Sequence, residues 1–247
     1  MRFFITLLMS FWLLLFTASV SAQVTIIINK QSYEFAQPIR LNSVLSIVAE
    51  SGDWYWPTSG IYNLNDAYAE REKGAVLSEI RMVLKSYNSN SDTYRALESL
   101  YQQVSSWTVS TRVITPISYN RARLIAEENP MFQPGRYLLR ISPRPSVVHF
   151  SGLVIKPGAY RHGDDLSIFS TAKSVTKASD ADKSHVFVIN PMGEIEKRGI
   201  AYWNIDYSQL MPGSQIYVPI TGQIFSSTLD ALNTRIANLA VHRILPQ

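Results

Sequence analysis

The sequence of 247 residues contains no cysteine, which excludes disulfide bonds, thiol nucleophiles and cysteine-ligated metals. A strong charge is absent too, because 23 Lys and Arg stand against 19 Asp and Glu, a formal net charge of +4. No run of basic residues resembles a phosphate-binding surface, so we expect no nucleic-acid partner. The stability of the chain therefore has to come from the packing of apolar side chains.

One long apolar run is present, and it stands at the N-terminus. Arg2 gives a basic start, residues 3–17 are apolar, and Val20, Ser21 and Ala22 form a small-residue cleavage site. We interpret residues 1–22 as a cleaved signal peptide rather than a retained anchor, because the run is short for a membrane span. No cysteine stands at the cleavage point, which excludes the acylated N-terminus of a lipoprotein.

The next part of the sequence predicts a sheet interrupted by helices. Residues 24–29 and 31–41 are typical of a hairpin. Apolar residues then recur at three- and four-residue steps between 76 and 107, which predicts two amphipathic helices joined by a polar turn. Residues 111–117, 121–128 and 136–142 are strand-like again. We expect the strands before residue 57 and after residue 110 to form one sheet, with a helical insert at about 58–110.

The sequence after residue 143 predicts a second domain. The prolines of residues 142–145 indicate a linker, because proline enters neither a helix interior nor a central strand. Turns at Pro157–Gly158 and at Asn190–Gly193 each separate two strand-like runs, with a helical stretch between the two pairs. A last strand follows Gly213. Hairpin, helix, hairpin and final strand is the order of the β-grasp fold.

The last segment, residues 222–247, predicts an amphipathic helix. Leu229, Leu232, Ile236 and Leu239 form its apolar stripe, while Arg235 and Arg243 lie off the stripe, and we expect Arg235 to face water. Three arrangements would cover the stripe: an oligomeric pore, a membrane surface, or the second domain of the same chain. We expect the helix to fold back on the second domain, with the helical insert helping to cover it.

Few side chains suggest a site. Trp54 and Trp56 offer aromatic planes for sugar rings, although aromatics beside a proline more often pack a seam, which we favour. Tyr202 and Trp203 fit either role. Arg112 keeps its charge when buried, and its planar guanidinium matches carboxylates, including those of acidic sugars. A structural role fits equally well, in which Arg112 holds a carboxylate or backbone carbonyls between the two domains.

Catalytic and metal-binding patterns are weak in this sequence. The four histidines lack the spacing of a zinc site, and adjacent carboxylates such as Glu127 and Glu128 point in different directions along a strand. No nucleophile elbow, phosphate loop or dinucleotide fingerprint appears. We therefore expect no enzyme activity, no cofactor and no metal.

A family resemblance adds to these interpretations. Residues 152–172, 186–195 and 210–220, with the spacing of Gly152, Pro157–Gly158, Tyr160, Gly193 and Pro212–Gly213, resemble the soluble-ligand-binding (SLBB) β-grasp module of outer-membrane polysaccharide export proteins. The whole mature chain is similar to the GfcC family of capsule biosynthesis proteins, with a W-x-P element at 54–57, a helical insert, an arginine opening the next strand and a terminal amphipathic helix.

This resemblance implies an α+β fold with two tandem β-grasp (ubiquitin-like) domains, residues 23–143 and 144–221, followed by the terminal helix. It implies a place in the periplasm of a Gram-negative bacterium and a non-catalytic role in capsule or exopolysaccharide assembly and export. Arg112 matches a central arginine that lines a pocket in the family. We expect a monomer that contacts export or assembly proteins at the outer membrane and holds polysaccharide. The alternatives are a carbohydrate-active enzyme and a pore-forming export subunit.

Overall fold

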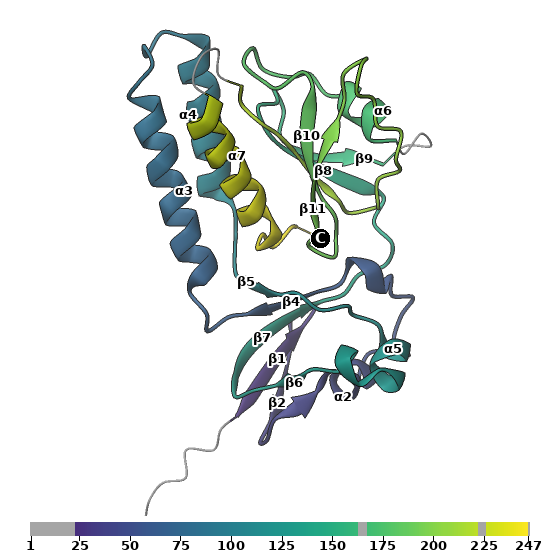
Figure 1. Cartoon of the computed structure of the whole chain (residues 1–247). Helices are drawn as coiled ribbons and strands as arrows, with labels where there is room; N and C mark the ends of the chain where they lie inside the picture. Colours follow the sequence, from purple (N-terminus) through teal and green to yellow (C-terminus); the bar gives the residue numbers. More distant parts are fainter. Residues whose placement is uncertain (1–22, 163–166, 222–225, 247) are drawn as a thin grey trace, which may run out of the picture.

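The computed structural model describes residues 23–162, 167–221 and 226–246, and the expected signal peptide at 1–22 lies outside them. Within these ranges the fold is mixed α+β, as the sequence predicts, with three β-sheets and six α-helices (Figure 1). The helices are α2 (Leu41–Ser46), α3 (Tyr68–Leu84), α4 (Asp92–Ser106), α5 (Tyr119–Leu124), α6 (Ile168–Lys173) and α7 (Ser226–Val241). No helix of the described residues is long and apolar enough to cross a membrane.

The first five-stranded sheet, sheet 1, joins segments from both sides of the helical insert. Its order is β2 (Gln31–Phe35), β1 (Val24–Ile28), β7 (Gly135–Arg140), β4 (Gly60–Asn63) and β5 (Thr111–Val113). Strand β1 pairs antiparallel with β2 and parallel with β7. Strands β1 and β2, before residue 57, and strands β5 and β7, after residue 110, therefore share one sheet as predicted.

The second five-stranded sheet, sheet 2, repeats this order. It runs β9 (Gly158–Arg161), β8 (Val147–Gly152), β12 (Gln215–Val218), β10 (His185–Ile189) and β11 (Ile195–Gly199). Strand β8 pairs antiparallel with β9 and parallel with β12, as β1 does with its two neighbours in sheet 1. A third sheet holds only β3 (Ile39–Arg40) and β6 (Met131–Phe132).

Sheet 1 has a hydrophobic core on one face. Alternate residues of β1, Val24, Ile26 and Ile28, are buried, while Thr25 and Ile27 between them are only partly covered. The buried side chains meet Leu41, Val44 and Leu45 of α2, which stand three and four positions apart on one side of that helix. The opposite face of sheet 1 is left for other contacts.

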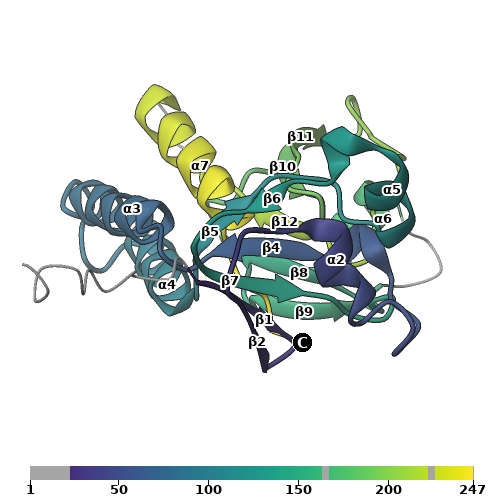
Figure 2. The same ribbon diagram turned by 90° about the horizontal axis from the view of Figure 1, so that it is seen from below.

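Sheet 2 is covered on both faces, since all four residues of β12 are buried. Gln215 and Tyr217 lie on the face toward α7, because their side chains donate hydrogen bonds to Ala240 O (2.8 Å) and Asn233 Oδ1 (2.8 Å). Ile216 and Val218 therefore point to the other face. Figures 1 and 2 show α6 on that other side.

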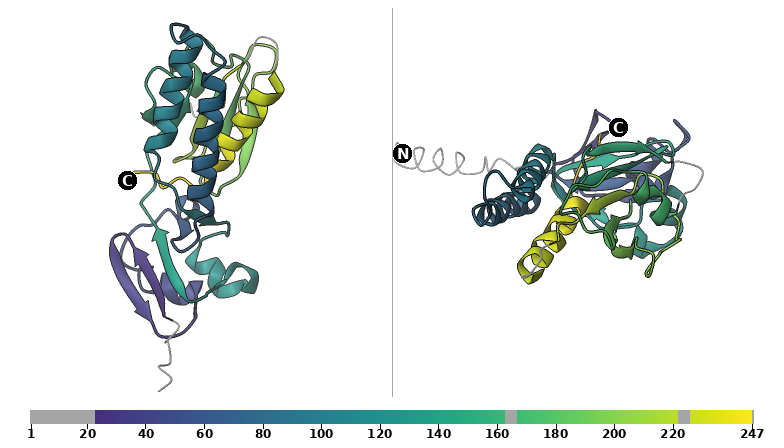
Figure 3. Two further views of the ribbon diagram at one scale, coloured as in Figure 1. Left: turned by 90° about the vertical axis from the view of Figure 1, so that its left-hand side faces the viewer. Right: turned by 90° about the horizontal axis from the view of Figure 1, so that it is seen from above.

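The helical insert starts from sheet 1 but packs on sheet 2. Apolar residues of α3 and α4 join the same buried cluster as β8, β10, β12 and α7. The Gln103 side chain of α4 donates to Gly152 O (2.9 Å) and accepts from Gly152 N (3.0 Å), so one side chain satisfies both backbone groups of the residue that ends β8. Figure 3 shows α3, α4 and α7 side by side along sheet 2.

The terminal helix α7 folds back as expected, because Leu229, Leu232, Ile236 and Leu239 are buried in the cluster that the insert and sheet 2 share. The expectation for Arg235 was wrong in one respect. Its guanidinium forms ion pairs with Glu72 (3.2 Å) and Glu79 (3.0 Å) of α3, so it links two helices instead of facing only water.

Two further expectations were wrong. The insert does not start at residue 58, because residues 60–63 form β4 inside sheet 1; α3 and α4 span 68–106. Residues 121–128 are not a strand, since α5 ends at Leu124 and a 3₁₀ turn follows. Ser118 caps α5 at the N–H of Arg121 (3.5 Å), and Arg, Ala and Leu favour a helix once a cap is present.

Candidate functional site

A cavity of about 640 Å³ lies between sheet 1 and sheet 2. The linker residues 142–146 form part of its wall, β4, β5 and β7 contribute from sheet 1, and β8, β12 and the C-terminal segment contribute from the other side. Its size falls in the range of about 300–1,000 Å³ that is usual for ligand sites. We call it the intersheet pocket.

The register of sheet 1 decides which side chains reach the intersheet pocket. Ile61 pairs with Leu139 and both are buried in the core on the α2 side. Tyr62 pairs with Arg112, and Arg140 pairs with Gly60 two positions before Tyr62. Since successive residues of a strand point to opposite faces, these four residues lie on the face away from the core.

Arg112, a predicted site residue, bridges the two sides of the pocket. Its Nη2 donates to Ser59 O (3.3 Å), next to β4, and to Pro191 O in the turn between β10 and β11. Its backbone N–H donates to Nδ1 of His242 (3.0 Å). Among the described residues no carboxylate forms an ion pair with Arg112. Of the two roles that the sequence suggests, the structure therefore favours the structural one, in which Arg112 holds backbone carbonyls.

The turn that Arg112 holds approaches β5 closely. Gly193 has φ of +96°, and a Cβ at this position would lie 3.0 Å from Cδ1 of Ile114 and 3.3 Å from Cγ1 of Val241. Only glycine takes that backbone conformation without strain. The sequence signal Asn190–Gly193 therefore marks a contact between the two sheets as well as a hairpin turn.

Tyr62 and Arg140 stand beside Arg112 on the pocket face. Tyr62 is buried and its hydroxyl donates to Arg243 O (3.2 Å). Burial raises the pKa of Tyr62, and the positive charges of Arg112 and Arg140 offset part of that rise. Burial lowers the pKa of both guanidiniums, so each arginine carries its charge in a partly dry environment.

The wall on the side of sheet 2 contains Arg243, His149 and Gln215. The Arg243 guanidinium lies 4.6 Å from the ring centre of Trp107 and its Nη1 is 3.4 Å from Gln215 Oε1. Burial lowers the pKa of Arg243 to about 10, so it stays charged at neutral pH. Burial, and then the charge of Arg243, lower the pKa of His149 to about 4, so that imidazole is neutral.

The charges around the intersheet pocket have one sign. The basic residues that line it are Lys30, Arg112, Arg140, Arg144 and Arg243. None of the described lining residues is Asp or Glu. Within the described ranges no group of three or more His, Cys, Asp and Glu could hold a metal ion. The pocket is therefore suited to an anion rather than to a cation.

The two predicted tryptophans occupy different places. Trp54 lines the intersheet pocket, and its Nε1 donates to Val48 O (2.7 Å) while the ring packs against the core of sheet 1. Trp56 packs against the same core and is not among the described residues that line the pocket. Both rings therefore serve the packing that the sequence favours, and Trp54 alone also shares the pocket with Arg112.

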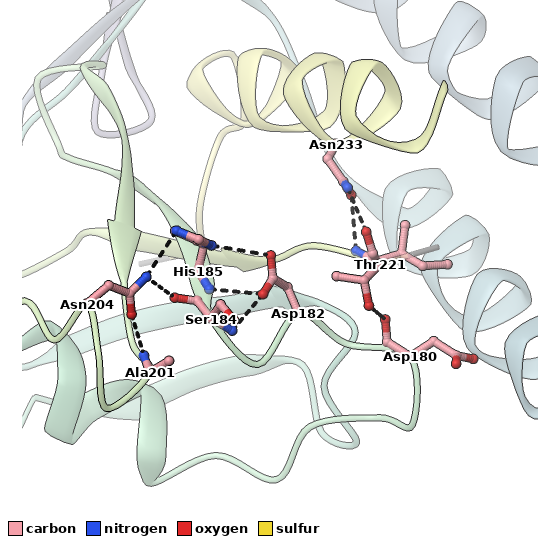
Figure 4. A network of polar contacts seen from close by, with 9 residues as sticks. Asp180, Asp182, Ser184, His185, Ala201, Asn204, Thr221 and Asn233 are labelled. Atoms are coloured by element: carbon pink, nitrogen blue, oxygen red, sulfur yellow. Dashed lines mark hydrogen bonds and ion pairs between the residues drawn. The ribbon is translucent and has the colours of Figure 1, made fainter. Parts of the chain in front are cut away.

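Tyr202 and Trp203, left open by the sequence, are displayed at the surface with 91% and 77% of their area exposed. Their turn is held by Asn204, whose Oδ1 accepts from Ala201 N (2.9 Å) and whose Nδ2 donates to Ser184 O (3.1 Å). Figure 4 shows Asn204 beside His185, which in turn faces Asp182. The aromatic pair is thus exposed on a well-held turn.

Sequence reasoning missed Arg140 and Arg243 as pocket residues. Arg140 lies in the strand-like run 136–142, where it follows the apolar Leu139. Once β7 is known to pair with β4, this alternation places Arg140 on the face away from the core. Arg243 was expected only to lie off the apolar stripe of the terminal helix. It follows α7, and the isolated bridge between Val109 and Arg243 directs it to the pocket, which helical periodicity does not predict.

Comparison with known proteins agrees with the GfcC resemblance noted in the sequence. The family description "Capsule biosynthesis GfcC, N-terminal" matches residues 18–144, and "Capsule biosynthesis GfcC C-terminal" matches residues 157–245. A relative from Escherichia coli (strain K12), "Uncharacterized protein YjbG", is 33% identical over 193 residues, which cover 77% of each chain. On these matches, the chain belongs to the GfcC family of capsule biosynthesis proteins.

Proposed function

We propose that this protein is a non-catalytic periplasmic accessory of capsule or exopolysaccharide assembly and export, which holds a polysaccharide segment in the intersheet pocket. The observation that carries the proposal is the pocket itself, about 640 Å³ in volume and lined from both sheets in a chain of a capsule biosynthesis family. Trp54 supplies an aromatic surface there for the apolar face of a sugar ring.

The strand order supports the finer part of the fold assignment. In each sheet an antiparallel hairpin comes first, and its first strand pairs parallel with the last strand of the sheet. This is the arrangement expected of two tandem β-grasp domains, residues 23–143 and 144–221. We propose that the second domain is the SLBB-like module and that its surface docks export or assembly proteins at the outer membrane.

The composition of the pocket supports a binding role over hydrolysis. Glycoside hydrolases generally use a pair of carboxyl groups on the two sides of the scissile bond. The described residues that line the intersheet pocket include no Asp or Glu. The cations and hydrogen-bonding groups among these residues can orient a glycan. They do not provide the pair of carboxyl groups that hydrolysis would use as acid and base.

The packing of α7 supports a monomer over a pore. A pore helix has to turn an apolar face to lipid, whereas Leu232, Ile236 and Ala240 of α7 are buried against sheet 2 and the insert. Removing α7 from this position would expose the buried cluster, and it would leave Tyr217 without its partner Asn233. The N-terminal apolar run supports export to the periplasm.

The test combines a strain that lacks the gene with the purified protein. We expect the strain to lose surface polysaccharide and to regain it with the intact gene, and cell fractionation to place the protein in the periplasm. The purified protein should bind the polysaccharide of that bacterium, release no cleavage product and elute as a monomer in plain buffer.

Three results would contradict the proposal. Cleavage products that disappear with a single Asp or Glu substitution would identify a carbohydrate-active enzyme. Ring-like oligomers in detergent would identify a pore-forming subunit. Unchanged surface polysaccharide in the strain that lacks the gene would remove the capsule role altogether.

A further inference from the structure

The five basic residues of the intersheet pocket differ in what they contact. Arg112 donates to two backbone carbonyls, which join the β4 side to the turn after β10. Among the described residues, the Arg140 guanidinium has no hydrogen-bond or ion-pair partner, although it is half-buried. Within the described part of the chain, the contacts of the Arg243 guanidinium are the ring of Trp107 and a long contact to Gln215.

The exposed cations stand at the edge of the same pocket. Lys30 follows Asn29 in the tight turn between β1 and β2, where both residues have positive φ. Arg144 belongs to the linker, and its guanidinium lies 5.3 Å from the ring centre of Tyr55. Every ion pair of the described residues lies on other side chains, so none of these pocket cations is neutralised by a carboxylate.

A half-buried guanidinium without a counter-anion is costly, because water solvates it poorly and no protein charge replaces the water. An anion that enters the pocket removes this cost. Guanidinium pairs well with planar oxyanions through two parallel hydrogen bonds. The pocket also has aromatic surface at Trp54 and Tyr62, which a small inorganic anion does not use.

We infer that the intersheet pocket binds a carboxylated sugar unit of a glycan, with Arg140 and Arg243 as the groups that pair with the carboxylate. Lys30 and Arg144 attract the anionic chain at the rim. Arg112 is a positioning residue that fixes the two walls by its carbonyl contacts. This inference rests on the proposed function and names the class of glycan that it requires.

The test compares two oligosaccharides of equal length. Hexagalacturonate carries a carboxylate on every ring, and maltohexaose is its neutral counterpart with the same type of linkage. Calorimetric titration of the purified full protein should give binding of hexagalacturonate at least about tenfold tighter than of maltohexaose. The affinity for hexagalacturonate should fall as salt rises from about 0.05 to 0.5 M, because the rim charges are screened.

Substitutions separate the binding groups from the positioning residue. Arg140→Gln should weaken hexagalacturonate binding at least about tenfold without lowering thermal stability, because it removes a poorly solvated charge and no protein partner, while Arg140→Lys should retain part of the affinity because the charge remains. Arg112→Gln should lower both affinity and melting temperature. Arg71→Gln, at an exposed site of α3, removes the same charge elsewhere and should change neither quantity.

The outcomes distinguish this inference from the proposed function. Equal affinity for the two oligosaccharides, unaffected by Arg140→Gln, would show that charge does not select the ligand, while a glycan-holding role would stand. Binding of neither oligosaccharide at millimolar concentration would overturn the inference. Loss of surface polysaccharide in the strain lacking the gene tests the function independently of both results. A tenfold effect of Arg71→Gln would also contradict the inference, since the charge would then act without a site.

Discussion

The two large sheets share a strand order and differ in what covers them. Sheet 2 has α6 on one face and α7 with the helical insert on the other, so its central strands are buried on both sides. Sheet 1 has a core only on the α2 side and presents Tyr62, Arg112 and Arg140 on the other face. Sheet 2 is thus packed on both faces, whereas the face of sheet 1 away from α2 lines the intersheet pocket and supplies cations to it.

This comparison predicts that substitutions where α7 packs on sheet 2 lower the free energy of unfolding more than substitutions on the pocket face of sheet 1. Asn233 is buried, accepts from Tyr217 Oη (2.8 Å) and Ile220 N (3.1 Å), and donates to Ile220 O (2.8 Å). Asn233→Ala should lower the free energy of unfolding by about 3 kcal/mol or more, because three buried polar groups lose their partner.

Chemical denaturation followed by circular dichroism measures this effect. Asn238→Ala changes the same residue type on an exposed position of α7 and should cost less than about 0.5 kcal/mol. Similar losses for the two variants would mean that α7 does not hold sheet 2 as described.

Acid should weaken the sheet 2 wall of the pocket through His149. Its pKa is lowered to about 4 in the folded protein, whereas an unfolded histidine titrates near 6.5. The unfolded chain therefore takes up a proton first as pH falls, and the free energy of unfolding should drop by about 3 kcal/mol between pH 6.5 and 4.

The variant His149→Gln isolates this contribution, because carboxylates and His242 titrate in both proteins. The wild type should lose more stability than His149→Gln over that pH range, in urea titrations at several pH values. Parallel pH profiles would contradict the assignment of a buried neutral imidazole beside Arg243.

The two arginines on the pocket face of sheet 1 should differ, because Arg112 contributes to stability and Arg140 does not. Arg112→Gln should lower the free energy of unfolding by about 1.5–3 kcal/mol, because a charged donor to two carbonyls is lost. Arg140→Gln should not lower it, since the substitution removes a poorly solvated charge and no protein partner. Denaturation curves of the two variants in the same buffer measure both free energies of unfolding. Equal losses would contradict the different roles of Arg112 and Arg140.

The smallest effect is expected at the exposed aromatic turn of sheet 2. Trp203→Ala should change stability by less than about 0.5 kcal/mol, because the side chain is 77% exposed. Asn204→Ala removes the hydrogen bonds that hold the turn and should cost about 1–2 kcal/mol. Melting temperatures of both variants test this order, and a larger loss for Trp203→Ala would place that ring in a contact that the structure does not contain.

The sequence predicts much of the fold because its patterns are local. The stripe of α7 and the stripes of the insert follow helical periods, and the turns at Pro157–Gly158 and Gly193 follow glycine and proline chemistry. The strand at 60–63 was missed because four residues between a proline turn and a helix give too short a pattern. Helix α5 was missed because Arg, Ala and Leu alternate in polarity as a strand would.

The pocket is harder to predict because it depends on pairings distant in sequence. Arg112 was found through a family resemblance, and its carbonyl contacts depend on Ser59 and Pro191, 53 and 79 residues away. Arg140 reaches the pocket only through the register of β4 with β7. No local pattern contains that register.

The central claim is that groups from both walls of the intersheet pocket bind one acidic glycan segment. The most direct measurement is the change in backbone amide NMR signals of the ¹⁵N-labelled protein on titration with hexagalacturonate. The account predicts shifts at Arg140 on sheet 1 together with Gly213 and Gln215 on the sheet 2 side of the pocket, and none at Tyr202 or along the exposed side of α4. Shifts confined to one sheet, or centred on the exposed aromatic turn, would contradict it.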